Sequence, residues 1–292
     1  MNIEQGMPGP GNLTAYFRKE ELKISLPSKG QFYPPGIISL DANGEVGVFP
    51  MTATDELTMK TPDALLSGES TVKVIQSCVP AITNAWLMPA MDIDFILIAI
   101  RIATYGESMP VTSIVPNTGT KQDHNVDLQK VLAGVDLEMA DTSCQLDNGL
   151  KVICKPNNYQ QLSLIRRSTF EKQRLARTIG SADLDDKEKQ EEFNKIFRAL
   201  TEINVESLTN NIDAVVTPEG SVNDKTSITE FISNVQLKHV NVIREHLVKM
   251  SSTGKVPPIT VESPEEDVKK GAPKTYSVPI LFDNSDFFAS RS

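Results

Sequence analysis

Reactive side chains are scarce in this chain. Its 292 residues include three cysteines, three histidines and one tryptophan. A sparse, odd number of cysteines argues against a disulfide framework. We therefore expect Cys78, Cys144 and Cys154 to be free thiols in a protein that folds in a reducing cytoplasm. If Asn148-Gly149 is the two-residue loop of a hairpin, Cys144 pairs with Ile153 and Cys154 faces the other side of the sheet.

Long apolar runs and an excess of positive charge are also missing. The most apolar stretch, residues 95–100, ends at Arg101 and is far shorter than the about 20 residues of a membrane-spanning helix. The first residues lack the apolar segment of a signal peptide. The net charge of −9 disfavours binding to nucleic acid or to anionic membranes. We expect a soluble protein that binds neither nucleic acid nor membrane.

Known catalytic patterns are absent as well. The sequence contains no phosphate-binding loop, no dinucleotide-binding glycine pattern and no nucleophile elbow. His239 and His246 share one predicted helix face without further ligands, so we expect packing or surface roles for them. Carboxylate pairs such as Asp92 and Asp94 stand at predicted helix starts, where they interact with free amides. The sequence predicts no catalytic residue, no cofactor and no metal. An unrecognised hydrolase would need a cleft with a perturbed carboxylate or histidine, which no spacing indicates.

The periodicity predicts an α+β fold, with small β-hairpin units and a mainly helical body. Thr54 and Gly106 are the expected start and end signals of two of the helices. The expected strands and hairpins cover residues 22–26, 37–40, 46–49, 109–128 and 144–154, and a final extended segment covers 276–282. The expected longer helices cover 92–105, 159–178, 185–204, 228–235 and 239–250.

Composition divides the chain into five segments. Residues 1–20 form a Gly/Pro-rich flexible arm, and residues 21–110 a β-hairpin plus helical domain. Residues 111–155 form a β-rich knuckle and hairpin, residues 156–253 a helical domain, and residues 254–292 an extended C-terminal tail.

One turn has the shape of a degenerate zinc-ribbon knuckle. In Val115-Pro-Asn-Thr-Gly119, Val115 and Thr118 stand where a zinc knuckle has its two thiolates. Structural zinc sites need about four nitrogen or sulfur ligands. Valine has no lone pair and a neutral threonine hydroxyl is a weak ligand, so we expect packing or hydrogen bonds to hold this turn.

Aromatic side chains near the two ends are the candidate partner-binding residues. They are Tyr16 and Phe17 in the arm, and Phe282, Phe287 and Phe288 in the tail. Exposed aromatics are effective anchors at protein interfaces. For Phe287 and Phe288 two alternatives stay open: docking in the protein's own core, or insertion into a partner.

Three stretches of the sequence are similar to a known family. The first is Leu22-Lys-Ile-Ser-Leu-Pro-Ser-Lys-Gly30, followed by Phe49-Pro-Met-Thr-Ala-Thr-Asp-Glu-Leu57. The second is Leu65 to Cys78, then Met91-Asp-Ile-Asp94 and Leu97-Ile-Ala-Ile-Arg-Ile-Ala-Thr-Tyr-Gly106. The third is the knuckle running into Val126-Asp-Leu-Gln129, together with Val278-Pro-Ile-Leu-Phe282 and the terminal aromatics. In this order, the motifs resemble the baseplate hub and hub-assembly proteins of T-even-like, contractile-tailed phages.

The resemblance implies a non-enzymatic structural or assembly protein of the baseplate hub. It implies other baseplate and tail hub proteins as partners, and a place in the tail of the virion after assembly in the host cytoplasm. A homo-oligomer within the baseplate stays open. The alternative is a tail assembly chaperone that is absent from the mature virion. Relatives often carry Cys-x-x-Cys at the knuckle and again before the terminal strand, whereas this chain has no cysteine at Val115, at Thr118 or in residues 262–267.

Overall fold

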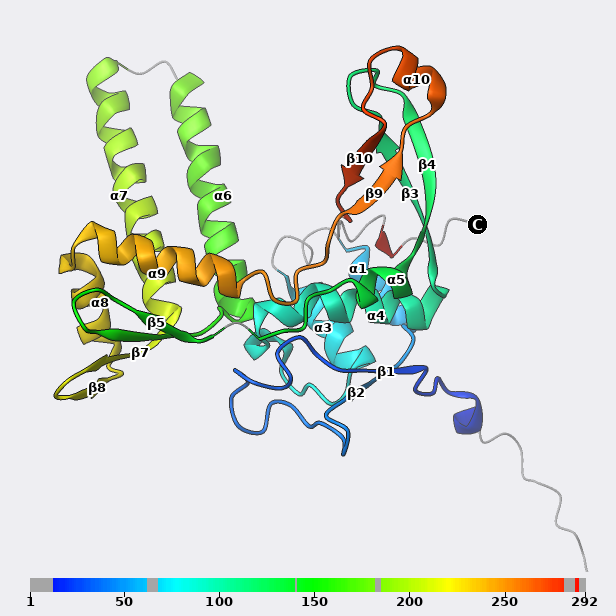
Figure 1. Cartoon of the computed structure of the whole chain (residues 1–292), viewed down its shortest axis with the longest axis horizontal. Coiled ribbons are helices and arrows are strands. Elements are labelled where there is room, and N and C mark those ends of the chain that lie inside the picture. The colour runs from blue at the N-terminus through cyan, green and yellow to red at the C-terminus, as the bar shows by residue number, and fades with distance from the viewer. Residues whose placement is uncertain (1–12, 62–67, 140, 182–184, 281–286, 289–292) are drawn as a thin grey trace, which may run out of the picture.

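The fold is α+β, with helices and short strands in several small antiparallel sheets. The computed structural model describes residues 13–61, 68–139, 141–181, 185–280 and 287–288. Figure 1 shows a body from which two arms rise on the same side, one a helical hairpin and the other a pair of β-ribbons.

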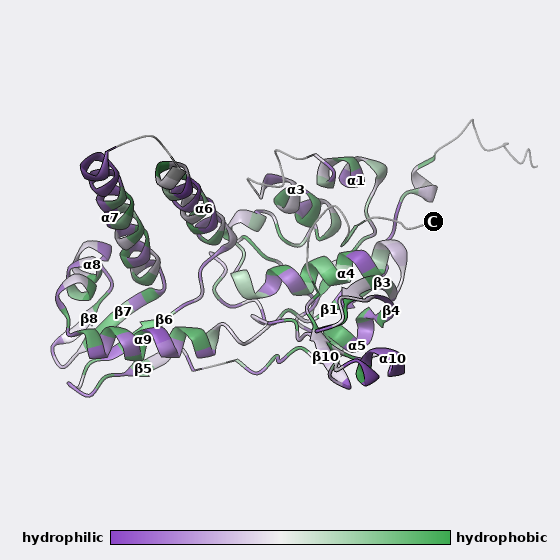
Figure 2. Cartoon of the chain, turned by 90° about the horizontal axis from the view of Figure 1, so that it is seen from above, coloured by the Kyte–Doolittle hydropathy of each residue, from purple (hydrophilic) through white to green (hydrophobic). Residues whose placement is uncertain are grey.

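The body is built around one apolar helix, α4 (Ile93–Tyr105). Eight of its residues are buried, as expected for a helix that is apolar on all sides. Its strong hydrophobic colour is visible in Figure 2. Gly106 ends it with a positive φ of 85°, which confirms the predicted stop signal. The other body elements are β1 (Leu22–Ile24), β2 (Val46–Val48), α1 (Ala53–Met59), α3 (Glu69–Cys78), η2 (Ala85–Leu87), η3 (Ala90–Asp92) and α5 (Leu128–Ala133). The short helix η1 (Leu13–Tyr16) precedes them in the chain.

Two details of the body differ from the prediction. Helix α1 starts two residues earlier than predicted, because Thr52 caps it: the Thr52 hydroxyl accepts the Asp55 N–H, and the Asp55 carboxylate accepts the Thr52 N–H. The strand predicted at residues 37–40 is reduced to one isolated bridge between Ile38 and Ile82.

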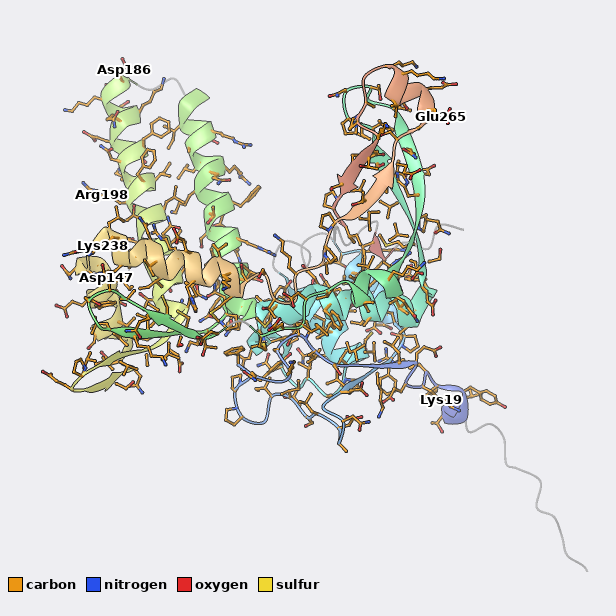
Figure 3. The ribbon with its side chains drawn as sticks, viewed as in Figure 1. Lys19, Asp147, Asp186, Arg198, Lys238 and Glu265 are labelled. Carbon is orange, nitrogen blue, oxygen red and sulfur yellow. The ribbon has the colours of Figure 1, made fainter. Side chains whose placement is uncertain are left out.

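The β arm consists of two antiparallel ribbons. The first pairs β3 (Ser108–Ile114) with β4 (Lys121–Asp127) around the predicted knuckle. The second pairs β9 (Ile259–Glu262) with β10 (Thr275–Val278), with α10 (Glu265–Lys269) between them. The segment that we predicted as an extended tail thus contains a ribbon that packs on β3 and β4. Glu265 marks the far end of this arm in Figure 3.

A second unit carries the helical arm. Its sheet has the order β5-β6-β7-β8, and α7, α8 and α9 pack on it around a separate core. The sequence did not predict β7 and β8. The elements are β5 (Ser143–Gln145), β6 (Lys151–Cys154), α6 (Tyr159–Ser181), α7 (Asp186–Asn210), β7 (Ile212–Thr217), β8 (Gly220–Val222), α8 (Lys225–Asn234) and α9 (Leu237–Met250).

The β5–β6 hairpin has a different register from the predicted one. Leu146 and Leu150 close a three-residue loop, so Cys144 pairs with Val152 and not with Ile153. A one-residue shift moves a side chain to the other face of a sheet. Cys144 and Cys154 therefore both lie in the second core, as buried free thiols. Burial raises the pKa of the Cys154 thiol to about 12.

The two ends of the second unit meet at the body. The Gly254 N–H donates to the Asp136 carbonyl at 2.9 Å, and the Thr253 hydroxyl donates to the Glu138 carbonyl at 3.0 Å. Gly254 has a φ of +75°, and a Cβ there would lie 2.5 Å from the Met91 carbonyl oxygen. Only glycine fits this close approach of the two units.

Candidate partner-binding surfaces

The N-terminal aromatics protrude from the body. Tyr16 is the last residue of η1 and Phe17 follows it. Figure 1 shows η1 outside the body. Tyr16 is 86% exposed, Phe17 64% and Leu13 67%. An apolar group of this size on a short projection is unusual for a protein surface and typical of an interface.

Arg18 fixes the chain directly after these aromatics. Its guanidinium donates to the Pro50 carbonyl at 2.7 Å, to the Asp55 carboxylate at 3.1 Å, and to both the carbonyl and the hydroxyl of Ser77 at 2.8 Å. One side chain thus joins the arm to the starts or ends of two helices. The side chain of Asp55 is only 11% exposed, so solvent screens this ion pair less than a surface pair. The aromatic knob, Leu13, Tyr16 and Phe17, is therefore presented from a fixed base.

Asp92 organises the turn that follows β1. It accepts hydrogen bonds from the Ser28 N–H, the Ser28 hydroxyl and the Tyr33 hydroxyl at 2.6–2.8 Å. The expectation that Asp92 satisfies helix amides was wrong, since its side chain makes no cap hydrogen bond. Burial raises its pKa to about 6, and these three hydrogen bonds oppose the shift. Its role is to tie two distant segments of the body together.

The terminal aromatics lie in the core of the body. Phe287 and Phe288 are each 2% exposed. The Tyr105 hydroxyl donates to the Phe288 carbonyl at 2.9 Å, and the Arg101 guanidinium lies 5.6 Å from the centre of the Phe287 ring. In the structure, both rings are therefore docked in the protein's own core, as in the first of the two alternatives. Phe282, the remaining candidate, lies outside the described residues.

The knuckle of the β arm is closed by hydrogen bonds to the second ribbon. The Thr120 hydroxyl donates to the buried Asp267 carboxylate at 2.9 Å, and the Asn117 side chain donates to the Gly271 carbonyl at 3.0 Å. Val115 is fully buried. Within the described segments, no three His, Cys, Asp or Glu residues are grouped in a way that could hold a metal ion.

One contact between the ribbons has the elements of a nucleophile–base pair. The Ser113 hydroxyl lies 2.8 Å from the His124 Nε2 and 2.7 Å from the Tyr276 hydroxyl. A catalytic pair needs an accessible nucleophile and a group that orients the base. Ser113 is only 7% exposed, and its hydroxyl is already hydrogen-bonded to the Tyr276 hydroxyl. Sequence reasoning missed this group, whose visible effect is to join β3 and β4 to β10.

Two clefts lie in the part of the chain that the structure describes. A cleft of about 730 Å³ lies between β4 and β9, and another of about 530 Å³ lies between α7 and α8.

Deep burial raises the pKa of Cys78, the thiol nearest to Arg18, to about 12 and keeps it protonated. Across the described ranges, no helix is both long and apolar enough to span a membrane.

The helical arm exposes apolar side chains along its length. Phe170 is 59% exposed and Leu164 57% on α6, and Phe197 is 66% exposed on α7. Ile196, the neighbour of Phe197 on α7, is buried, whereas Phe197 faces solvent. The tip of α7, where Figure 3 labels Asp186, is hydrophilic in Figure 2.

A comparison with protein families gives one match over most of the chain. The family model described as "T4 bacteriophage base plate protein" matches residues 19–288. The searches found no matching curated protein and no matching solved structure.

Proposed function

The chain belongs to the family of T4 bacteriophage base plate proteins, and from this premise we propose that it builds or helps to assemble the baseplate hub of a contractile tail. The family indicates a general structural role in the baseplate, with other baseplate proteins as partners. The hub, and a permanent place in the virion tail, are the finer parts of the proposal.

The observation that carries the proposal is the aromatic knob of Leu13, Tyr16 and Phe17. It is exposed by 64–86%, and Arg18 holds its base through hydrogen bonds to Pro50, Asp55 and Ser77. Presenting large side chains from a fixed base lowers the entropy cost of binding. Large aromatics are also the side chains most often found at the energetic centre of interfaces. A protein that acts by contact, without chemistry, needs such a surface.

We also propose that the knuckle is a degenerate zinc ribbon held without metal. Val115 takes the place of the first thiolate and Thr118 that of the second. The hydrogen bonds from Thr120 to Asp267 and from Asn117 to Gly271 do the work of the metal, which is to hold the two ribbons together.

The experiment is quantitative mass spectrometry of purified, intact particles. A low, constant number of copies per tail supports a built-in hub component. Absence from particles, together with abundance in the infected lysate, would contradict this role and support the assembly chaperone. Particles stripped to isolated baseplates serve as the control for loosely attached protein.

A further inference from the structure

An arginine row on α6 stands out from the charge of the rest of the chain. The chain has a net charge of −9 and nine arginines, and four of these lie on α6 between residues 166 and 177. They are Arg166, Arg167, Arg174 and Arg177, and all four are exposed. Arg167 also forms an exposed ion pair with Glu171 at 3.0 Å on the same helix. With Lys172 and one acidic residue, Glu171, the helix has a net charge of +4.

The four arginines share one face with Phe170. At about 100° per residue, these five positions fall within about 100° of arc. Ile165, Ala176 and Ile179, which are half-buried or buried, lie on the other side, and α6 packs on α7. The row therefore faces away from α7 and extends over about 16 Å at 1.5 Å per residue.

A small cleft of mixed polarity lies at the foot of the row. It has a volume of about 130 Å³ and is lined by Trp86, Gln160, Ser163, Leu164 and Arg167. Trp86 stacks on Tyr159 with ring centres 5.6 Å apart, so one wall of the cleft is fixed. An apolar side chain fits there beside a guanidinium.

This combination specifies the chemistry of a partner. Arginine, unlike lysine, binds carboxylates with two parallel hydrogen bonds. Phe170 is exposed among the arginines, so a partner that covers it needs an apolar side chain between its own carboxylates. We propose that the α6 row binds an acidic amphipathic helix of a neighbouring baseplate subunit, with an apolar residue in the cleft beside Trp86. The inference names a partner type for the proposed function and rests on it.

Protein fits the row better than nucleic acid. A surface that follows a phosphate backbone needs a broad positive field, but the chain as a whole is acidic and the positive charge is limited to one helix face. Phe170 and the cleft beside Trp86 also suit a side-chain interface. Nucleic acid and a second copy of this chain are therefore treated as outcomes that the experiment distinguishes.

The experiment is site-specific photo-crosslinking in infected cells that express the full-length chain. Phe170 is replaced by the photoreactive p-benzoylphenylalanine, and the crosslinked peptides are identified by mass spectrometry. We expect one dominant peptide with a net negative charge from another baseplate protein. The double variant Arg174→Glu/Arg177→Glu should lower its yield at least about tenfold, since it removes two charge-assisted contacts.

The matched control is Lys187→Glu/Lys189→Glu on α7. It makes the same change in charge on the same arm but away from the row, and the crosslink should persist. Equal yields from both double variants would overturn the inference, as would a crosslink to nucleic acid, to a second copy or to a peptide that is not acidic. Thermal melting of the purified variants separates these results from misfolding.

The outcome is independent of the mass spectrometry of particles. If the protein is absent from particles but the arginine-dependent crosslink forms in the lysate, the hub proposal fails and the α6 inference stands. If the protein is present in particles but no such crosslink forms, only the α6 inference fails.

Discussion

Ser28 donates two hydrogen bonds to Asp92, one from its backbone N–H at 2.8 Å and one from its hydroxyl at 2.6 Å. The two residues are 64 positions apart and belong to two of the sequence motifs that resemble the hub family. The motifs are therefore two halves of one buried contact, at which a turn after β1 is fastened to the start of α4.

Asp92 should give stability a specific dependence on pH. Its pKa is about 6 in the folded protein against 3.8 as the ordinary value, so the folded state binds the proton more tightly. Its contribution is most favourable below about pH 4 and is lost as the pH rises through about 6. From pH 4 to 7, the free energy of unfolding of the wild type should fall by about 2 kcal/mol relative to Asp92→Asn. Urea unfolding at several pH values measures this, and a constant difference between the two proteins would contradict it.

The aromatic knob should affect assembly without affecting the fold. Tyr16→Ala/Phe17→Ala removes side chains that are 86% and 64% exposed, so the melting temperature should stay unchanged. Incorporation into tails should fall at least about tenfold, the effect of losing an aromatic hot spot. Leu237→Ala/Val248→Ala, on equally exposed positions of α9, is the control. A similar loss of incorporation in both variants would show that exposed apolar area in general is responsible.

The terminal aromatics should affect the fold. Phe288→Ala removes a side chain that is 2% exposed, and such a truncation costs about 3–5 kcal/mol. Phe170→Ala, at a position that is 59% exposed, should cost little. Denaturant unfolding of both variants tests this. Unchanged stability together with lost incorporation would favour the other alternative, an anchor into a partner.

Gly254 should tolerate no side chain. In Gly254→Ala the new methyl group would lie 2.5 Å from the Met91 carbonyl oxygen at a φ of +75°, so we expect a loss of at least about 2 kcal/mol. Gly180→Ala, in open space on α6, should instead stabilise by up to about 1 kcal/mol. Calorimetry of the two variants provides the comparison. Equal effects on stability would show that the backbone around Gly254 and Met91 shifts at little cost to admit a methyl group.

Restoring thiolates at the knuckle should not create a tight zinc site. Val115→Cys/Thr118→Cys supplies two ligands, and Asp267 already accepts a hydrogen bond from Thr120. Structural zinc needs about four ligands. We expect no stoichiometric zinc in the purified variant by elemental analysis. One zinc per chain would show that further ligands from the second ribbon reach the turn.

Local signals predicted those parts of the fold that local chemistry decides. The apolar run before Gly106 predicted α4 and its end, and Asp185 before a periodic stretch predicted the start of α7, which it caps through Glu188. These elements needed no information from distant residues.

Other parts depend on information that the sequence shows only weakly. Asp147-Asn148-Gly149 is compatible with a two-residue or a three-residue loop. The loop length sets the register of the hairpin, and the register determines on which face of the sheet Cys144 lies. Strand β7 was missed because it pairs on both sides, so its burial does not alternate regularly. The burial of Phe288 depends on Tyr105, 183 positions away.

The hydrogen bonds between residues 253–254 and 136–138 have a consequence for the history and folding of the chain. The chain leaves the body and returns to it at almost the same point, so the unit with the helical arm has the connectivity of an inserted domain, which compact proteins accept at such sites. Its core consists of residues between 144 and 250, whereas the core of the body also includes Ile280, Phe287 and Phe288 near the C-terminus. During synthesis the inserted unit is therefore complete first.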